Sequence, residues 1–290
     1  MAVDAGTQIT DLQLGDHACL TYGEREELLD LTAAFVRDGL SAGLKVVWLS
    51  DEVAAQAASE LTRREIEVEP AVASGQFAAV PSEGRLVSGK AFRTGQANEW
   101  LNSQLSACQQ EGFQGLRVAM DMNWALQPVT GVEQLPEFEQ GLAAVLAGGA
   151  VSVLCQYDRE RFDPVTLGSV AGFHTRSVAA STYHADAVLR ICRQYAPPGI
   201  RIAGEIDFRA AEPLALALAE AIRLAGDITI NLASLSFIDA ACTRMIMDAA
   251  RGTAGARKVF LVCSASVADR FASLGAAGLP GVSLVSVDDG

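Results

Sequence analysis

Apolar runs alternate with stretches of helical periodicity along the first half of the chain. A run at 18–21 predicts a short strand, and residues 24–40 then repeat apolar side chains at helical spacing. Residues 45–50 (KVVWLS) predict a strand buried on both faces, because their apolar residues are continuous rather than alternating. The same pattern predicts further helices over 53–64, 94–111 and 132–146 and strands over 77–80, 116–120 and 151–156. Strands separated by such helices indicate crossover units and a mostly parallel sheet of the α/β class.

A second, shorter series of strands and helices follows a stretch of small and polar residues at 179–186, which predicts a linker. We therefore expect two domains, 1–180 and 186–290. In the second, strands are predicted over 187–193, 199–206, 227–231, 259–262 and 282–285, and helices over 213–224, 240–251 and 266–274.

Composition predicts a globular protein. Of the 290 residues, 50% are hydrophobic and 20% charged, and the formal net charge of −13 argues against nucleic-acid or membrane partners. The six cysteines are scattered, mostly in apolar strings, as expected for buried, reduced thiols. The N-terminus shows no secretory signal, and the longest apolar stretch, 141–155, is short and interrupted by glycines. These features predict a cytoplasmic location.

Two motifs of the second domain resemble a known family. Gly204-Glu205-Ile206-Asp207 ends a predicted strand, and Phe237-Ile238-Asp239 precedes a predicted helix. In this order they are similar to STAS domains of the anti-sigma-factor-antagonist family, whose signature is G-E-[IL]-D followed by F-[IL]-D-S-S-G at a helix start. The resemblance covers essentially the whole second domain. It implies a small α/β fold with a mixed sheet, and an anti-sigma factor of the serine kinase type as partner, bound in the unphosphorylated state and released on phosphorylation.

The motif departs from the family at the usual phosphoacceptor, where this chain has Ala241, followed by Cys242 in place of glycine. Asp239 is placed to cap the following helix, where an added phosphate would meet the positive end of the helix dipole. Three interpretations remain open: permanent partner binding with control moved to the first domain, phosphorylation of a nearby hydroxyl (Thr243, Ser236 or Ser234), or a domain used for dimerisation or scaffolding. The predicted partner-binding residues are Asp207, Ser236, Asp239, Ala240, Ala241, Cys242 and Thr243.

The first domain begins like a nucleotide-binding domain of the RecA/KaiC type but lacks its phosphate loop. After the first strand, the segment 22–27 reads Tyr-Gly-Glu-Arg-Glu-Glu, so carboxylates stand where glycines and a lysine would hold a triphosphate. Residues 84–90 match G-x-x-x-x-G-K, but Ala91 provides no hydroxyl for magnesium and the context of strand, loop and helix is missing. We therefore expect a degenerate P-loop and no cofactor.

Three segments of the first domain, 15–22 (GDHACLTY), 116–125 and 154–159, resemble the MEDS sensory domain. The resemblance spans roughly Gly15 to His174. It implies a fold related to RecA/KaiC, a sensory role towards small ligands, and a place in front of kinase or STAS modules.

In a parallel sheet, ligands gather at the carboxyl ends of the strands. The candidate ligand-binding residues at those ends are His17, Tyr22, Asp51, Asp121, Trp124, Tyr157 and Arg159. Structural alternatives remain open for some of them, since His17 also suits a hydrogen bond at a strand edge and Asp121 a helix cap. His174 and His184 are expected to face solvent. No metal site is expected, because no two histidines have ligand spacing on one element.

Three functions follow from these patterns. The favoured one is a non-enzymatic signalling regulator, in which a small-molecule ligand of the sensory domain controls how the STAS domain binds an anti-sigma factor. The second is a nucleotide hydrolase or phosphotransferase that uses Asp121 and the carboxylates around Asp51. It is disfavoured because no nucleophile–base pair is evident and no catalytic residue is predicted. The third is a scaffold in a stress-signalling complex, and a homodimer is left open.

Overall fold

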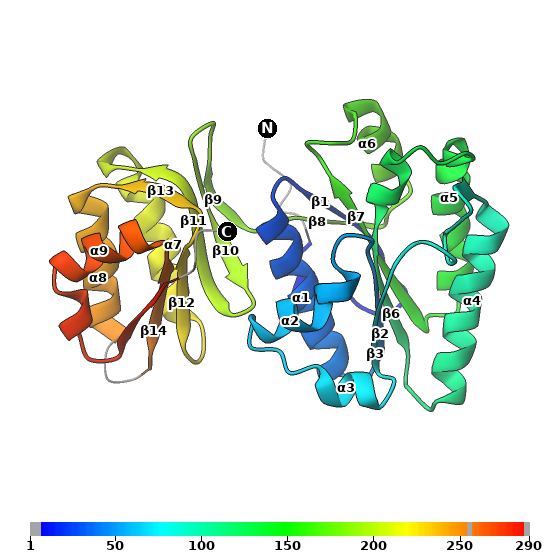
Figure 1. Ribbon diagram of the computed structural model, residues 1–290, viewed down its shortest axis with the longest axis horizontal. Coiled ribbons are helices and arrows are strands. Elements are labelled where there is room, and N and C mark those ends of the chain that lie inside the picture. The colour runs from blue at the N-terminus through cyan, green and yellow to red at the C-terminus, as the bar shows by residue number, and fades with distance from the viewer. Residues whose placement is uncertain (1–6, 254–256, 287–290) are drawn as a thin grey trace. The chain divides into compact units, whose positions relative to one another are not determined.

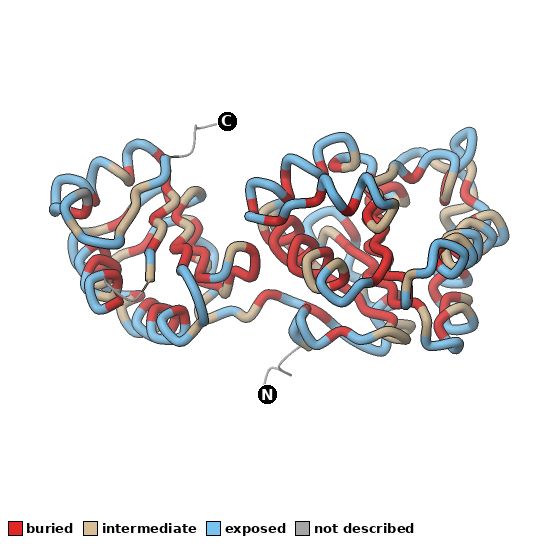
Figure 2. Tube along the Cα trace, turned by 90° about the horizontal axis from the view of Figure 1, so that it is seen from below, coloured by how far each residue is buried: buried red, intermediate tan, exposed pale blue. Residues whose placement is uncertain are grey.

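The computed structural model describes residues 7–253 and 257–286. The chain divides into two compact units, Met1–Ala179 and Ala180–Gly290. Each unit has its own hydrophobic core, and Figure 2 shows buried residues along the chain of both units. None of the helices in the described part of the chain combines the length and apolar character that crossing a bilayer requires.

The first unit is built on a six-stranded parallel sheet with the strand order β3-β2-β6-β7-β1-β8. Every residue of β2 is buried, as its continuous apolar sequence predicts for a strand covered on both faces. The strands are β1 (His17–Tyr22), β2 (Lys45–Leu49), β3 (Phe77–Val80), β6 (Leu116–Asp121), β7 (Val151–Asp158) and β8 (Arg176–Val178).

Helices cover both faces of this sheet. Figure 1 shows α1 on one face, while α4 and α5 pack side by side on the other. The helices are α1 (Arg25–Ser41), α2 (Ala57–Thr62), α3 (Glu69–Ala73), α4 (Thr94–Gln110), α5 (Leu135–Leu146) and α6 (Pro164–Ala171). The predicted parallel α/β architecture of this unit is confirmed.

The pattern missed the short elements of the first unit. These are α3, α6, β8 and a two-stranded hairpin of β4 (Val87–Ser88) and β5 (Ala91–Phe92). Apart from α6, which has 8 residues, each has at most 5 residues and displays little of a helical or strand repeat. The helix predicted over 53–64 is also shorter than expected, since a 3-10 turn (Ala54–Gln56) precedes α2.

The second unit contains a mixed sheet with the strand order β15-β14-β12-β11-β10-β9. A further strand, β13, lies off this path and pairs with the end of β11, while β12 pairs with the start of β11. β9, β10 and β11 are antiparallel, and the remaining pairs are parallel. The strands are β9 (Thr182–Ala185), β10 (Leu189–Tyr195), β11 (Pro198–Ile206), β12 (Ile228–Leu232), β13 (Leu235–Ile238), β14 (Val259–Cys263) and β15 (Val282–Ser286). The helices are α7 (Ala211–Arg223), α8 (Ala240–Thr253) and α9 (Ala265–Ser273).

Two predictions for this unit are wrong. The segment 179–186, predicted as a linker, contains β9, which pairs with β10 and belongs to the sheet. The segment 235–239, for which no strand was predicted, contains β13, which pairs with β11 in parallel. Both strands have only four residues and lie among small or polar neighbours, so their pairing rather than their own sequence defines them.

Candidate functional site

The turn between β1 and α1 holds a carboxylate of the chain itself. Glu27, in the first turn of α1, is buried, and its Oε2 accepts a hydrogen bond from the backbone N–H of Gly23 at 3.0 Å. The Nη2 atom of Arg159 lies 3.8 Å from the same oxygen. A side chain at position 23 would collide with the Arg159 guanidinium. Since N–H groups at a helix start attract anions, Glu27 supplies from within the chain the negative charge that a phosphate supplies in a P-loop.

The G-x-x-x-x-G-K segment at 84–90 forms a β-hairpin rather than a phosphate loop. β4 and β5 pair antiparallel, and Gly89 and Lys90 between them have φ angles of 57° and 62°. Two consecutive positive φ angles are typical of a type I′ hairpin turn. The prediction that this segment lacks the context of strand, loop and helix is confirmed.

Four buried polar residues form a hydrogen-bonded chain at the carboxyl ends of β1, β2 and β6. Asn123 donates from Nδ2 to the Tyr22 hydroxyl at 2.8 Å and from its backbone N–H to Asp121 Oδ1 at 3.0 Å. The Ser50 hydroxyl donates to Asp121 Oδ2 at 2.9 Å. Burial raises the pKa of Asp121 to about 6, although the bonds from Asn123 and Ser50 work against the rise. Burial also raises the pKa of Tyr22.

Most of the seven predicted ligand-binding residues lie inside the first unit. Five of them are buried: His17, Tyr22, Asp121, Trp124 and Tyr157. Trp124 stacks on Phe92 in the core with ring centroids 4.5 Å apart, and Asp51 accepts the backbone N–H of Ser82 at 2.7 Å. A ligand pocket shared by all seven therefore stays a prediction. A groove of about 340 Å³ in this unit is lined by residues outside the predicted set, two of them from the G-x-x-x-x-G-K segment: Val80, Gly84, Arg85, Trp100 and Gln104.

A second buried polar cluster surrounds Glu139, a residue of α5 that is 0% exposed. Its Oε2 lies 3.0 Å from His17 Nε2, 3.5 Å from His174 Nε2 and 3.5 Å from Cys155 Sγ. Its Oε1 accepts a hydrogen bond from the Tyr157 hydroxyl. The rings of His17 and His174 are in contact, with centroids 4.1 Å apart.

Burial and neighbouring charges set the protonation of this cluster. Burial alone would raise the pKa of Glu139, but the hydrogen bond from His17, the charges of the two histidines and the hydrogen bond from Tyr157 lower it overall. Burial lowers the pKa of His174 despite the nearby carboxylate. Burial and Glu139 together raise the pKa values of Cys155 and Tyr157 well above their usual range.

The sequence predicted His17 and Tyr157 as ligand-binding residues, but it did not predict that they meet around Glu139. His174 was expected to face solvent, whereas its side chain is only 1% exposed. The argument against a metal site required two histidines on one element, but these donors come from β1, α5, β7 and the segment between α6 and β8. Only the pairing of β1 with β7 hints at the cluster, because it places His17 opposite Val153, two residues before Cys155 on the same face.

In the second unit, Asp239 connects the two motif segments. Its Oδ1 accepts the N–H of Cys242 at 2.8 Å, which caps α8 as predicted, and its Oδ2 accepts the N–H of Phe208 at 2.8 Å. The aromatic side chains beside these bonds remain exposed, Phe208 to 67% and Phe237 to 41%. The Arg270 guanidinium lies over the Phe237 ring at 5.5 Å.

Burial divides the seven predicted partner-binding residues. Ser236, Ala240 and Ala241 are exposed, and Asp207 and Asp239 are half-buried. Cys242 and Thr243 are only 0% and 1% exposed, and Cys242 packs in the core of this unit, so a direct contact of either with a partner stays a prediction. The Thr243 hydroxyl donates to the backbone oxygen of Asp239 at 2.7 Å.

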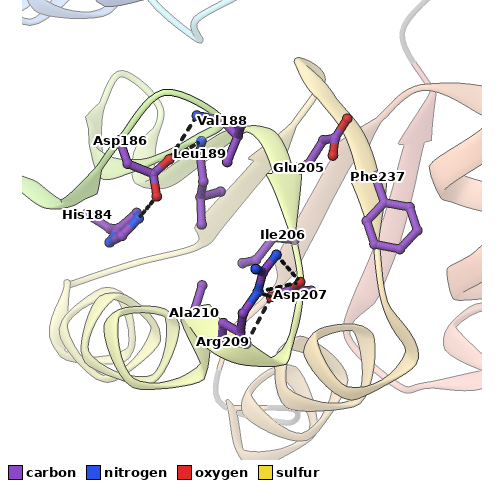
Figure 3. A pocket seen from close by; sticks show the side chains of 10 residues that line it. All are labelled: His184, Asp186, Val188, Leu189, Glu205, Ile206, Asp207, Arg209, Ala210 and Phe237. Carbon is purple, nitrogen blue, oxygen red and sulfur yellow. Dashed lines mark hydrogen bonds and ion pairs between the residues drawn. The ribbon is translucent and has the colours of Figure 1, made fainter.

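A groove of about 270 Å³ lies beside these segments (Figure 3). Asp207 and Arg209 form an ion pair of 2.7 Å in it, and His184 pairs with Asp186 at 2.9 Å. The backbone N–H of Val188 and the bond from His184 lower the pKa of Asp186 to about 2. Phe237 forms the wall at β13, so the groove and the exposed aromatic side chain belong to one surface.

Comparison with known protein families gives a match that lies within the first unit. The family model named MEDS, for MEthanogen/methylotroph, DcmR Sensory domain, matches residues 16–175. A comparison with curated proteins found no relative.

Solved structures similar to this chain include a KaiC-like protein from Pyrococcus horikoshii, with 15% identity over 63% of this chain and 79% of that chain and a TM-score of 0.45. Another is the flagellar accessory protein FlaH from Methanocaldococcus jannaschii, with 11% identity over 68% of this chain and 92% of that chain and a TM-score of 0.44. The MEDS match runs from the residue before β1 to the residue before β8 and covers more than half of the chain. The chain therefore belongs to the MEDS family of sensory domains.

Proposed function

We propose that this protein is a signalling regulator in which the MEDS unit senses a small ligand and the second unit, a STAS-type domain, binds an anti-sigma factor of the serine kinase type. In this proposal partner binding does not depend on phosphorylation of the usual serine. The observation that carries it is the exposed surface of Phe208, Phe237, Ala240 and Ala241 around the Asp239 cap.

The geometry of this surface supports a protein partner. Two large aromatic side chains, Phe208 and Phe237, lie exposed near the hydrogen-bonded turn at Asp239, and Phe237 lines a groove that could receive a partner side chain. Aromatic residues are enriched at interface hot spots because they bury a large area at low entropic cost. Burying one exposed Phe contributes about 1.5–3 kcal/mol.

The chemistry of the α8 start supports control without phosphorylation at the usual place. Ala241 has no oxygen to accept a phosphoryl group, and the hydroxyl of Thr243 is buried and already donates a hydrogen bond. Of the hydroxyls considered from the sequence, Ser234 and Ser236 are exposed, and the Ser236 hydroxyl donates to the Gly204 oxygen at 3.0 Å. Phosphorylation would therefore have to occur on one of these two serines.

The start of α1 supports a role without nucleotide turnover. Glu27 occupies the Gly23 N–H that a phosphate would need, and a triphosphate there would meet a buried carboxylate. Calorimetric titration of the full chain with ATP and magnesium tests this point: micromolar binding with turnover would favour the hydrolase or phosphotransferase instead.

The direct test is binding of the full chain to purified anti-sigma kinases. We expect a stable complex that ATP does not dissociate. Phe237→Ala should weaken it about tenfold or more, since an interface aromatic is worth more than about 1.4 kcal/mol. Leu216→Ala is the matched control, because Leu216 is an apolar residue of α7 that is 59% exposed in the same unit.

Three outcomes would contradict the proposal. Equal losses for both variants would show that the surface around Asp239 is not the interface. Phosphate on Ser234 or Ser236, with release of the partner, would show that the usual switch has only moved. Absence of binding to every anti-sigma kinase would favour the scaffold.

A further inference from the structure

The cluster around Glu139 has the composition of a metal site. His17, Glu139, Cys155 and His174 each offer one donor atom, and these four atoms lie within 4.8 Å of one another. They are two imidazole nitrogens, one carboxylate oxygen and one thiol sulfur, which are the ligand types that zinc takes in proteins. They come from four different elements, so only the folded unit brings them together.

The spacing of the donors suits a single tetrahedral ion. Bonds of about 2.0–2.3 Å from zinc to N, O and S place neighbouring ligand atoms about 3.3–3.8 Å apart. Here Glu139 Oε2 lies 3.0 Å from His17 Nε2 and 3.5 Å from both His174 Nε2 and Cys155 Sγ. The distance between Cys155 Sγ and His17 Nε2 is 3.6 Å. The remaining pairs of donors lie within 4.8 Å. Shifts of up to about 1 Å would therefore bring all four to the spacing of a tetrahedral ion.

The tautomer of His174 leaves one of its ring nitrogens free to bind a cation. Its Nδ1 lies 2.8 Å from the backbone oxygen of Val170, which can only accept, so Nδ1 carries the proton. In the neutral ring, Nε2 then presents a lone pair towards Glu139, and this buried atom has no hydrogen-bond partner. Two electron-rich atoms facing each other in a dry site repel unless a proton or a cation lies between them.

The charges and the supporting contacts agree with a divalent ion. One carboxylate and one thiolate together neutralise a charge of +2, and the two histidines bind as neutral rings. The Val170 carbonyl holds His174, and the Tyr157 hydroxyl holds the second oxygen of Glu139. Such outer partners orient the ligands in protein metal sites. A thiolate with two imidazoles favours zinc over magnesium or calcium, which prefer oxygen ligands.

We propose that His17, Glu139, Cys155 and His174 bind one zinc-class transition-metal ion in a closed, four-ligand site. The ion would tie α5 and the segment after α6 to β1 and β7. This inference concerns the first unit alone and does not depend on the anti-sigma factor of the proposed function.

The test uses the reduced full chain, freed of metal with a chelator and titrated with Co²⁺ and then Zn²⁺. We expect one equivalent of Co²⁺ to bind with the visible bands of a tetrahedral ion and a near-ultraviolet thiolate-to-metal charge-transfer band. Zn²⁺ should then displace it. Zn²⁺ should also raise the thermal unfolding midpoint of the parent chain, because an ion bound by the folded state alone stabilises that state.

Two cysteine variants assign the site. Cys155→Ser should abolish the charge-transfer band and weaken binding at least tenfold. Cys108→Ser is the matched control, since Cys108 is equally buried in the core of the same unit but lies outside the cluster, and it should keep both band and affinity. If Cys155→Ser does not fold, His174→Gln takes its place. This variant should likewise lose tetrahedral metal binding.

The proposal is overturned if the parent chain binds neither ion, or if neither Cys155→Ser nor His174→Gln changes the binding. In those cases the cluster is a metal-free hydrogen-bonding network in which a protonated His174 faces Glu139. The parent titration shows whether the chain binds an ion, and the variants show whether it binds at this cluster.

Discussion

Asp121 is held in a place that disfavours its charge. The residue is 3% exposed and accepts hydrogen bonds from Asn123 and Ser50, but burial raises its pKa to about 6. Because the pKa in the folded state lies above the unfolded value near 3.9, the neutral form favours folding. This contribution is fully present below pH 4 and is lost as the pH rises through 6. Ionised Asp121 therefore costs the first unit stability at neutral pH.

We expect Asp121→Asn to remove this pH dependence. An amide keeps an acceptor for the Asn123 N–H but never ionises. Relative to the parent, the free energy of unfolding of the variant should therefore rise by about 2 kcal/mol between pH 4 and pH 7. Urea unfolding of both proteins at these two pH values measures the difference. Glu99→Gln, an exposed carboxyl-to-amide change on α4, is the control and should show no gain. If the free energies of unfolding of Asp121→Asn and of the parent changed equally between these pH values, ionisation of Asp121 would have no effect on stability.

Residue roles that depend on local chain geometry could be predicted, and those that depend on distant contacts could not. Asp121 and Asp239 were each considered as helix caps, and both accept the N–H of a residue two or three positions later. Glu139 received no role, since it looks like any acid on an amphipathic helix until the fold turns it towards His17 and His174. A sequence without aligned relatives gives no signal for such a meeting of four elements.

At the scale of elements, periodic patterns predicted the long helices and the buried strands, while pairing decided the short strands. β2, β3 and β6 lie close to their predicted bounds because each consists mostly of apolar residues, with the charged Arg117 inside β6. β9 and β13 were missed because four residues with mixed burial carry little pattern of their own. β13 nevertheless brings Phe237 and Asp239 to the end of β11, where Asp207 lies. An element that the pattern missed thus positions the proposed interface.

The start of α8 should depend strongly on Asp239. Asp239→Ala removes the acceptor for two N–H groups, at Cys242 and at Phe208. We expect a loss of about 2–4 kcal/mol in the free energy of unfolding of the second unit, from the lost cap and one further bond to a carboxylate. Asp239→Asn keeps one acceptor and should lose about half as much. Urea unfolding measures both, and equal stability of Asp239→Ala and the parent would show that the turn is held by other contacts.

At the scale of the whole molecule, the chain should separate between Ala179 and Ala180 into two parts that fold alone. Composition and pattern placed the start of the second domain at 186, which would leave β9 outside it. The structure gives β9 a role in that unit, because it pairs with β10 and its Tyr183 hydroxyl donates to Glu220 on α7. Without β9, the edge of β10 would present unpaired N–H and C=O groups to solvent.

Two fragments test this boundary. We expect residues 180–290 to unfold in one cooperative transition at the urea concentration where the second unit unfolds in the full chain. Residues 186–290 should lose about 2–4 kcal/mol, since they lack a paired strand and the contact of Tyr183 with α7, and they should self-associate through the exposed edge of β10. Urea unfolding followed by circular dichroism measures stability, and sedimentation measures association. Equal stability of both fragments as monomers would return β9 to the role of a linker. Loss of folding in both would mean that the second unit depends on the first for its stability.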